Sequence, residues 1–154
     1  MSGKIESLGP ADLEIAGLRI WVHGRQFPDS KGYWDGNWLR VTAYCASGSA
    51  HVKVHGAIIH LGEIAGLKGG CEVLSQTLAG SAVLDCMEPG LRVELVARTL
   101  GHVAVKIQMT PDHMTESHCF KSEMDQTYLP SIVKACRMLL ERFPIVDQPK
   151  VAPG

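Results

Sequence analysis

Paired cysteines are absent from this sequence. Its five cysteines are odd in number and widely spaced, and no two of them form a Cys-x-x-Cys pair. A disulfide framework or a zinc knuckle requires cysteines paired at characteristic spacings. Cys71 and Cys136 instead fall on apolar helical stripes, where a thiol packs as a small hydrophobic group. We therefore expect free thiols in a reducing cytosol.

Long apolar runs and basic runs are absent as well. The start, MSGKIESLGPADLEI, lacks the continuous apolar core of a signal peptide, and no window approaches the ~20 apolar residues of a membrane span. Lys and Arg number 15 against 16 Asp and Glu, and no basic cluster is available to neutralise a phosphate backbone. We therefore expect a cytoplasmic protein that binds neither nucleic acid nor membranes.

Common catalytic and nucleotide-binding motifs do not occur either. The sequence contains no G-x-S-x-G, H-E-x-x-H or G-x-G-x-x-G, and no serine or threonine follows the lysine of the glycine-rich segment AGLKGGC. His102 follows a Leu-Gly turn and is a candidate for acid–base chemistry. Sequence proximity assigns it neither a carboxylate nor a nucleophile. We therefore expect no enzymatic activity and no cofactor.

What is present is the composition of a globular protein. At 154 residues, with 45% hydrophobic and 20% charged residues, the chain can bury a core without disulfides or a metal. No internal repeat or shift of composition divides it. We expect a single α+β domain over residues 13–145, preceded by a polar leader, residues 1–12, and followed by a flexible tail, residues 146–154.

Apolar residues that alternate with polar ones predict the strands. Leu18, Ile20 and Val22 share one face of the first strand. Two further segments, WLRVTAYCA and AHVKVHGAII, predict an antiparallel hairpin across SGS. The remaining predicted strands are SAVLDCM, LRVELVART, HVAVKIQMT and, with weaker alternation, HCFKSEM. The short links between these runs favour an antiparallel meander over crossover connections.

Apolar residues at steps of three and four predict two helices. The first begins at Leu61, and Gly66, Gly69 and Gly70 weaken it and can break it, because each glycine costs about 1 kcal/mol in a helix interior. Its apolar stripe consists of Ile64, Leu67, Cys71, Leu74 and Leu78.

The second helix is C-terminal. We expect Thr127 as its N-cap, Pro130 in its first turn and Pro144 just beyond its end. Together with the strands, the two helices predict an α+β fold. We expect a mostly antiparallel sheet of about six or seven strands, with both helices packed on one face.

The segment YWDGNWL, residues 33–39, contains two of the three tryptophans and one of the three tyrosines. Asp35 and Gly36 form a strong turn pair, in which Gly36 can take the positive φ that a tight turn demands. Either Trp34 or Trp38 closes one end of the sheet, with its indole N–H bonded to a carbonyl, or an aromatic ring is an exposed anchor for a partner. Both interpretations stay open. The residues that we expect at a protein-binding surface are Tyr33, Trp34, Asp35 and Asn37.

His51, His55 and His60 lie close together in sequence and suggest a metal site as the alternative. The side chains of residues 51 and 55 point to the same side of a strand, so both can reach one ion. Lys53 lies between them on that side, and no carboxylate or cysteine stands at a ligand-like spacing. We favour a solvated strand face. A small enzyme or metal protein that uses these histidines or His102 remains the alternative.

Four segments in order resemble the WapI family of immunity proteins, small intracellular bacterial partners of polymorphic toxins. They are LRIWVHGRQFPDSKGYWDGNWLRV, LAGSAVL, LGHVAVKIQM and DQTYLPSIVKACRMLLERFP. The resemblance covers roughly residues 13–145, and its most specific pieces are YWDGNWL and DQTYLP. It implies a non-enzymatic protein that binds and neutralises a cognate toxin, in the name-giving case a secreted nuclease.

Overall fold

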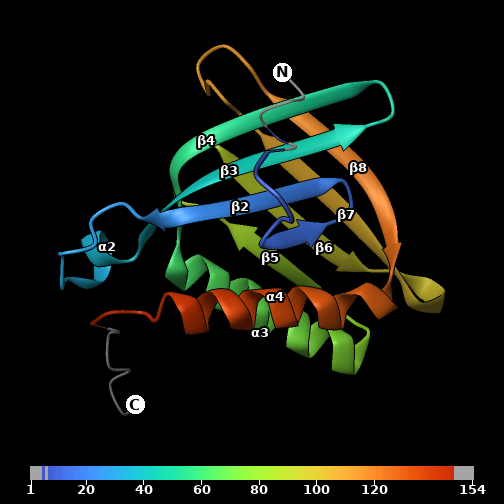
Figure 1. The fold of residues 1–154 in the computed structure, drawn as a ribbon. Helices are drawn as coiled ribbons and strands as arrows, with labels where there is room; N and C mark the ends of the chain where they lie inside the picture. Colours follow the sequence, from blue (N-terminus) through green and yellow to red (C-terminus); the bar gives the residue numbers. More distant parts are fainter. Residues whose placement is uncertain (1–4, 6, 148–154) are drawn as a thin grey trace.

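Two antiparallel four-stranded sheets form most of the computed structural model, which describes residue 5 and residues 7–147 (Figure 1). The first sheet contains β1 (Leu13–Ile15), β2 (Leu18–Arg25), β3 (Trp38–Ser47) and β4 (Ala50–His60), in that order. The second sheet contains β5 (Ser81–Asp85), β6 (Leu91–Ala97), β7 (His102–Met109) and β8 (His118–Asp125), also in order. Each strand pairs with the next one along the chain, so both sheets are meanders, as expected.

Three α-helices accompany the sheets in the described residues. They are α2 (Tyr33–Gly36), α3 (Leu61–Thr77) and α4 (Leu129–Arg142), and two 3-10 turns, η1 (Thr99–Gly101) and η2 (Gln126–Tyr128), complete the elements. α2 is a single turn that the sequence did not predict as a helix. None of the described helices is both long enough and apolar enough to cross a bilayer.

The α+β class is confirmed, but the single sheet of six or seven strands is wrong. The described residues form eight strands in two sheets, and no pairing joins β4 to β5. α3 lies between these two strands in sequence and carries the chain away from the first sheet. Alternation of apolar residues assigns each strand a buried face but does not say which sheet the strand joins. The division into two sheets therefore could not be inferred from the pattern.

The two long helices lie side by side along one side of the paired sheets (Figure 1). α3 packs on α4 and on β5, and α4 also contacts β1. β1 and β5 are edge strands of the first and second sheet. The expected packing of both helices on one face of a single sheet is therefore replaced by packing of α4 on β1 of the first sheet and of α3 on β5 of the second.

One apolar core joins both sheets and both long helices. The alternating residues Leu18 and Ile20 of β2 and Val93 and Leu95 of β6 are completely buried, as the pattern predicted. Burying each such side chain contributes about 1.5–3 kcal/mol. The largest fully buried side chains are Leu13, Ile15, Leu18, Ile20, Leu39, Ile59, Leu61, Ile64, Leu67, Leu74, Leu84 and Leu95.

α3 is continuous from Leu61 to Thr77, so the break allowed for at its glycines does not occur. Packing supplies the reason, because the apolar stripe of α3 is buried against the core from Leu61 to Leu74, whereas its last predicted member, Leu78, is the exposed C-cap. Gly70 also has a packing role: a Cβ there would lie 3.0 Å from the Cβ of Ala82 in β5. Gly66 and Gly69 face open space.

The start of α4 differs from the predicted capping. Thr127 is not the N-cap of this helix but lies in the 3-10 turn that precedes it. The carboxylate of Asp125 accepts the Thr127 N–H at 2.9 Å, and this bond lowers the pKa of Asp125. Pro130 does lie in the first turn of α4, and the helix ends at Arg142, before Pro144.

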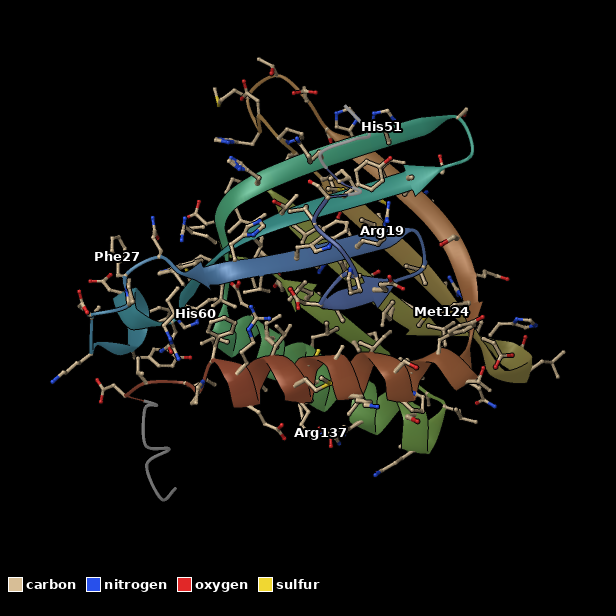
Figure 2. All side chains as sticks on the ribbon, viewed as in Figure 1. Arg19, Phe27, His51, His60, Met124 and Arg137 are labelled. Carbon is tan, nitrogen blue, oxygen red and sulfur yellow. The ribbon has the colours of Figure 1, made fainter. Side chains whose placement is uncertain are left out.

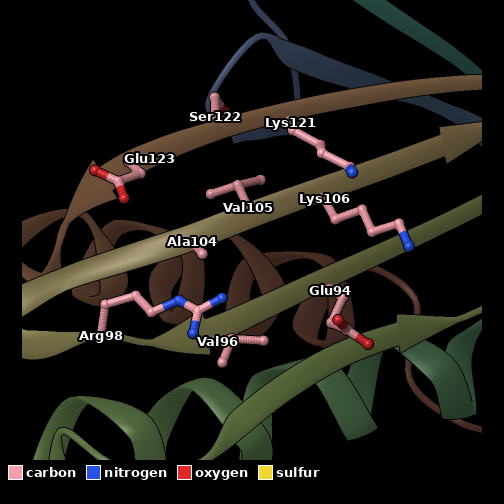
Figure 3. Close-up of a pocket in the computed structure, with 9 residues that line it drawn as sticks. All are labelled: Glu94, Val96, Arg98, Ala104, Val105, Lys106, Lys121, Ser122 and Glu123. Carbon is pink, nitrogen blue, oxygen red and sulfur yellow. The ribbon is translucent and has the colours of Figure 1, made fainter.

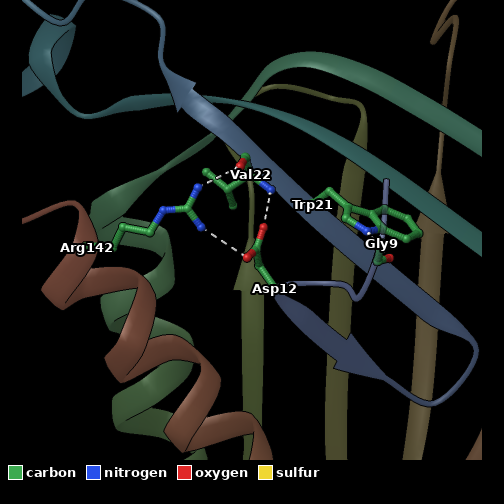
Figure 4. Close-up of polar contacts among 5 residues, drawn as sticks. All are labelled: Gly9, Asp12, Trp21, Val22 and Arg142. Atoms are coloured by element: carbon green, nitrogen blue, oxygen red, sulfur yellow. Dashed lines mark hydrogen bonds and ion pairs between the residues drawn. The ribbon is translucent and has the colours of Figure 1, made fainter. Parts of the chain in front are cut away.

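A small polar network fastens the end of α4 to the first sheet (Figure 4). Asp12 accepts the Val22 N–H at 2.7 Å and a guanidinium N–H of Arg142 at 3.2 Å. Trp21 is buried, and its indole N–H donates to the Gly9 carbonyl at 3.0 Å. The indole-to-carbonyl bond expected for Trp34 or Trp38 is thus found at Trp21, and part of the expected leader is tied to the sheet.

Candidate functional site

The aromatic segment YWDGNWL forms a tight corner between β2 and β3, in which Tyr33–Gly36 is the helical turn α2. Gly36 does not take the positive φ that a glycine allows. Gly36 is buried, and a Cβ there would lie 2.6 Å from Cγ2 of Val146 and 2.8 Å from the carbonyl oxygen of Ser30. Glycine is needed here for close approach between chain segments, because any side chain would overlap them.

Asn37 holds this corner in place from inside. Its side chain is completely buried. The amide donates to the carbonyl oxygens of Tyr33 at 2.7 Å and Val146 at 2.9 Å. Its oxygen accepts the Val146 N–H at 2.9 Å and a guanidinium N–H of Arg25 at 3.3 Å. Asn37 therefore positions α2 and does not face a partner. The expected flexible tail includes Val146, which is bonded here; its residues 148–154 lie outside the described part.

His60 lies beneath the aromatic side chains, at the point where β4 ends and α3 begins. The side chain is buried, and Nδ1 accepts the Gly62 N–H at 3.0 Å. Nε2 therefore carries the proton and donates to the Tyr33 carbonyl at 3.1 Å. The ring centroid of His60 lies 5.0 Å from that of Tyr33, 5.6 Å from that of Trp34 and 5.1 Å from that of Trp38.

Trp34 projects from this cluster into solvent. It is 59% exposed, although its ring packs edge-on against Tyr33 with centroids 5.2 Å apart. Met87, from the turn between β5 and β6, is 66% exposed and lines the same open groove. We call this hollow of about 400 Å³ the Trp34 groove. Its lining residues are Tyr33, Trp34, His60, Gly62, Glu63, Asp85, Cys86 and Met87.

Glu63 joins the two walls of the Trp34 groove. One carboxylate oxygen accepts the His60 N–H at 2.8 Å, and the other accepts the Met87 N–H at 2.8 Å. Burial raises the pKa of the Glu63 carboxyl above its ordinary 4.5, and the two backbone hydrogen bonds oppose this shift. Burial, together with the charges of Glu63 and Asp85, raises the pKa of the Cys86 thiol far above its ordinary range. The thiol is therefore unsuited to nucleophilic chemistry.

The Trp34 groove is acidic. Glu63 and Asp85 line it, and no lysine or arginine does. The side chain of Asp85 is 73% exposed and lies 3.5 Å from Arg92, which also contacts Glu94 at 3.6 Å. Asp35, the neighbour of Trp34, is exposed as well. The groove thus combines an exposed indole and thioether with negative charge.

The histidines proposed as metal ligands do not come together. His51 and His60 lie at opposite ends of β4 (Figure 2). His51 is exposed and stacks on Tyr44 with centroids 5.7 Å apart, His55 is exposed, and His60 is buried. No group of three His, Cys, Asp or Glu residues suitable for a metal ion is present in the described part of the chain.

A second hollow lies on the outer face of the second sheet (Figure 3). It has a volume of about 540 Å³, and Glu94, Lys106 and Lys121 form one row across β6, β7 and β8. Arg98 and Glu123 add one charge of each sign. Because its charges are mixed and its apolar residues are small, this surface indicates no particular ligand.

Sequence reasoning found only one side of the Trp34 groove. Tyr33 and Trp34 were expected at a binding surface, whereas Glu63, Asp85 and Met87 were not. One signal was available: Glu63 stands three residues after His60, the spacing at which a side chain returns to the backbone N–H of a helix cap. Nothing in the pattern placed Met87 near Trp34, because the two residues are 53 positions apart in the sequence and Met87 lies in a turn of the other sheet.

Comparison with known proteins shows a family. Residues 11–144 match the model of the immunity protein WapI-like family, so the match covers nearly the whole chain. It includes both sheets and both long helices. No curated protein and no solved structure matches the chain.

Proposed function

We propose that this chain, which belongs to the immunity protein WapI-like family, binds a cognate toxin and neutralises it by forming a complex. The family match over residues 11–144 is the observation that carries the proposal. The exposed Trp34 and Met87 support it, because tryptophan and methionine are enriched at protein interfaces. Within the proposal the toxin is of the nuclease type, as the resemblance implies, and the complex forms in the cytoplasm.

Neutralisation by binding rather than by catalysis is part of the proposal. The states of the buried thiols support it: burial raises the pKa of Cys45 and of Cys71 to about 11, and burial raises that of Cys136 to about 12. Such thiols carry almost no thiolate at neutral pH and pack as apolar groups.

Co-expression with the product of the toxin gene beside this chain's own gene tests the proposal. Cells that produce both proteins should grow, and the two proteins should elute as one complex in gel filtration. Cells with the toxin alone provide the control and should die. Continued killing together with separate elution would overturn the immunity role.

A titration separates binding from catalysis. Residual toxin activity should fall linearly as the chain is added and should vanish near one equivalent, because each molecule can occupy only one toxin. Complete and progressive inactivation by a small fraction of an equivalent would instead indicate an enzyme.

A further inference from the structure

We propose that the Trp34 groove holds a lysine or arginine side chain from a basic segment on the toxin surface. This inference rests on the proposed function, since it names where the toxin binds and by which chemistry. Three features of the groove carry it: an exposed indole held in a fixed orientation, carboxylates beside it, and no cation of the chain's own among its lining residues.

The exposed indole is organised before any partner arrives. Trp34 packs on Tyr33 and His60, and α2 is fixed by the buried amide of Asn37. The other two tryptophans are not available in this way, because Trp21 is 4% exposed and Trp38 is only partly exposed. A rigid aromatic surface loses little conformational entropy on binding, which favours its use as an anchor.

Other aromatic rings of this chain already have arginine side chains over their faces. Guanidinium groups stack on several of them, at distances of 4.8–5.9 Å from the ring centroid. The pairs are Arg19 with Trp21 and Tyr44, and Arg25 and Arg142 with Phe143. No such cation lies over Trp34 within residues 7–147, although tryptophan has the most attractive ring for one. The ring of Trp34 is therefore open to a cation from outside.

Charge complementarity selects a cation over other occupants. Asp85 has one oxygen 3.5 Å from Arg92, but its carboxylate is 73% exposed and remains open to a guanidinium or ammonium group that stacks on Trp34. Glu63 already accepts two backbone N–H groups, so its contribution is mainly negative potential. An acidic segment would meet two carboxylates, and the one cation paired with them, Arg92 beside Asp85, lies outside the lining and is shared with Glu94. A basic segment is attracted both by the indole ring and by the carboxylates, and the negative charge of the groove also speeds its association.

Binding of an inactivated form of the same toxin tests this assignment. Isothermal titration calorimetry at low and high salt should show that Trp34→Ala weakens affinity by about tenfold or more. Asp85→Asn should weaken affinity at low salt and make it less dependent on salt. Asp85→Lys should weaken it further. Tyr128→Ala is the matched control, because Tyr128 is 61% exposed and lies outside the groove lining, and it should bind like the wild type.

The outcomes separate the two proposals. If the wild type binds the toxin and the Trp34 and Asp85 variants bind equally well, the groove assignment is overturned and the immunity role stands. If Asp85→Lys binds more tightly than wild type, the occupant is not a cation and the assignment is again overturned. If the wild type does not bind the toxin, both proposals fall. Unchanged melting temperatures of the Asp85 variants exclude misfolding as the cause of lost affinity.

Discussion

Asn37 is completely buried, and both its amide nitrogen and its oxygen are bonded. These bonds join α2 to β2 through Arg25 and to the segment after α4 through Val146. Arg25 strengthens the same junction by donating to the carbonyl oxygens of Gly36, at 2.7 Å, and Pro144. At the residue scale, a buried amide therefore positions the exposed Trp34 beside it.

Replacing Asn37 with alanine should lower the free energy of unfolding by about 2–3 kcal/mol, because backbone groups of Tyr33 and Val146 lose their partners. Urea denaturation measures the change. Asp35→Ala, an exposed change in the same turn, is the control and should alter stability by no more than about 0.5 kcal/mol. Equal stabilities of the two variants would contradict this role of Asn37.

Glu63 should make stability depend on pH in the mildly acidic range. Its pKa is raised in the folded state, so the folded protein holds this proton more tightly than the unfolded chain. The stabilising contribution of this proton to the free energy of unfolding is fully present below about pH 4.5. It is lost as the pH rises through the pKa of Glu63 in the folded state. The carbon-13 titration of the Glu63 carboxyl should therefore have its midpoint above 4.5.

Glu63→Gln is the matched variant for this effect. Between pH 4.5 and neutrality, its free energy of unfolding should fall less with rising pH than that of the wild type, since the titrating group is gone. The variant also loses one carboxylate acceptor, so we expect lower absolute stability at neutral pH. A Glu63 midpoint at or below 4.5 would show that the hydrogen bonds outweigh burial.

At the scale of elements, α3 shows that packing can override helix propensity. Its glycines left the continuity of the helix open in the sequence, yet the element is unbroken because Leu61, Ile64, Leu67 and Leu74 are buried along it. Its first turn is also capped, since His60 and Glu63 satisfy backbone N–H groups that a helix start leaves free.

The three glycines of α3 should respond differently to alanine. Gly66→Ala and Gly69→Ala should each raise the free energy of unfolding by about 0.5–1 kcal/mol. The new Cβ meets open space in the folded protein, and alanine lowers the conformational entropy of the unfolded chain. Gly70→Ala should lower it, because the new Cβ would lie 3.0 Å from Ala82 of β5. Chemical denaturation of the three variants is the measurement. The same gain at all three positions would contradict the close packing at Gly70.

At the scale of the whole molecule, the Trp34 groove is assembled by segments that are distant in sequence. α2 supplies Tyr33 and Trp34, the junction of β4 and α3 supplies His60 and Glu63, and the turn between β5 and β6 supplies Met87. The groove therefore spans both sheets, and it exists only when α3 brings the second sheet against the first. We expect toxin binding to be lost together with folding and not to survive in a peptide containing YWDGNWL alone.

The sequence by itself determined the local elements and the family. Alternation located seven of the eight described strands but missed the short β1. Apolar steps of three and four located both long helices, and the motifs indicated the family that the match over residues 11–144 confirms. These features are local because they depend on side-chain spacing within one segment. The exposed position of Trp34 was one of two open interpretations, and the metal site at His51, His55 and His60 was the less favoured alternative to a solvated strand face.

Only the tertiary structure decided how these elements meet. The division into two sheets, the burial of Asn37 and His60, and the position of Met87 near Trp34 all depend on contacts between distant segments. A buried amide and an exposed one look identical in a sequence, because burial is a property of what packs around a residue. The same reason explains Gly36, whose need for glycine comes from Val146, 110 residues further along the chain.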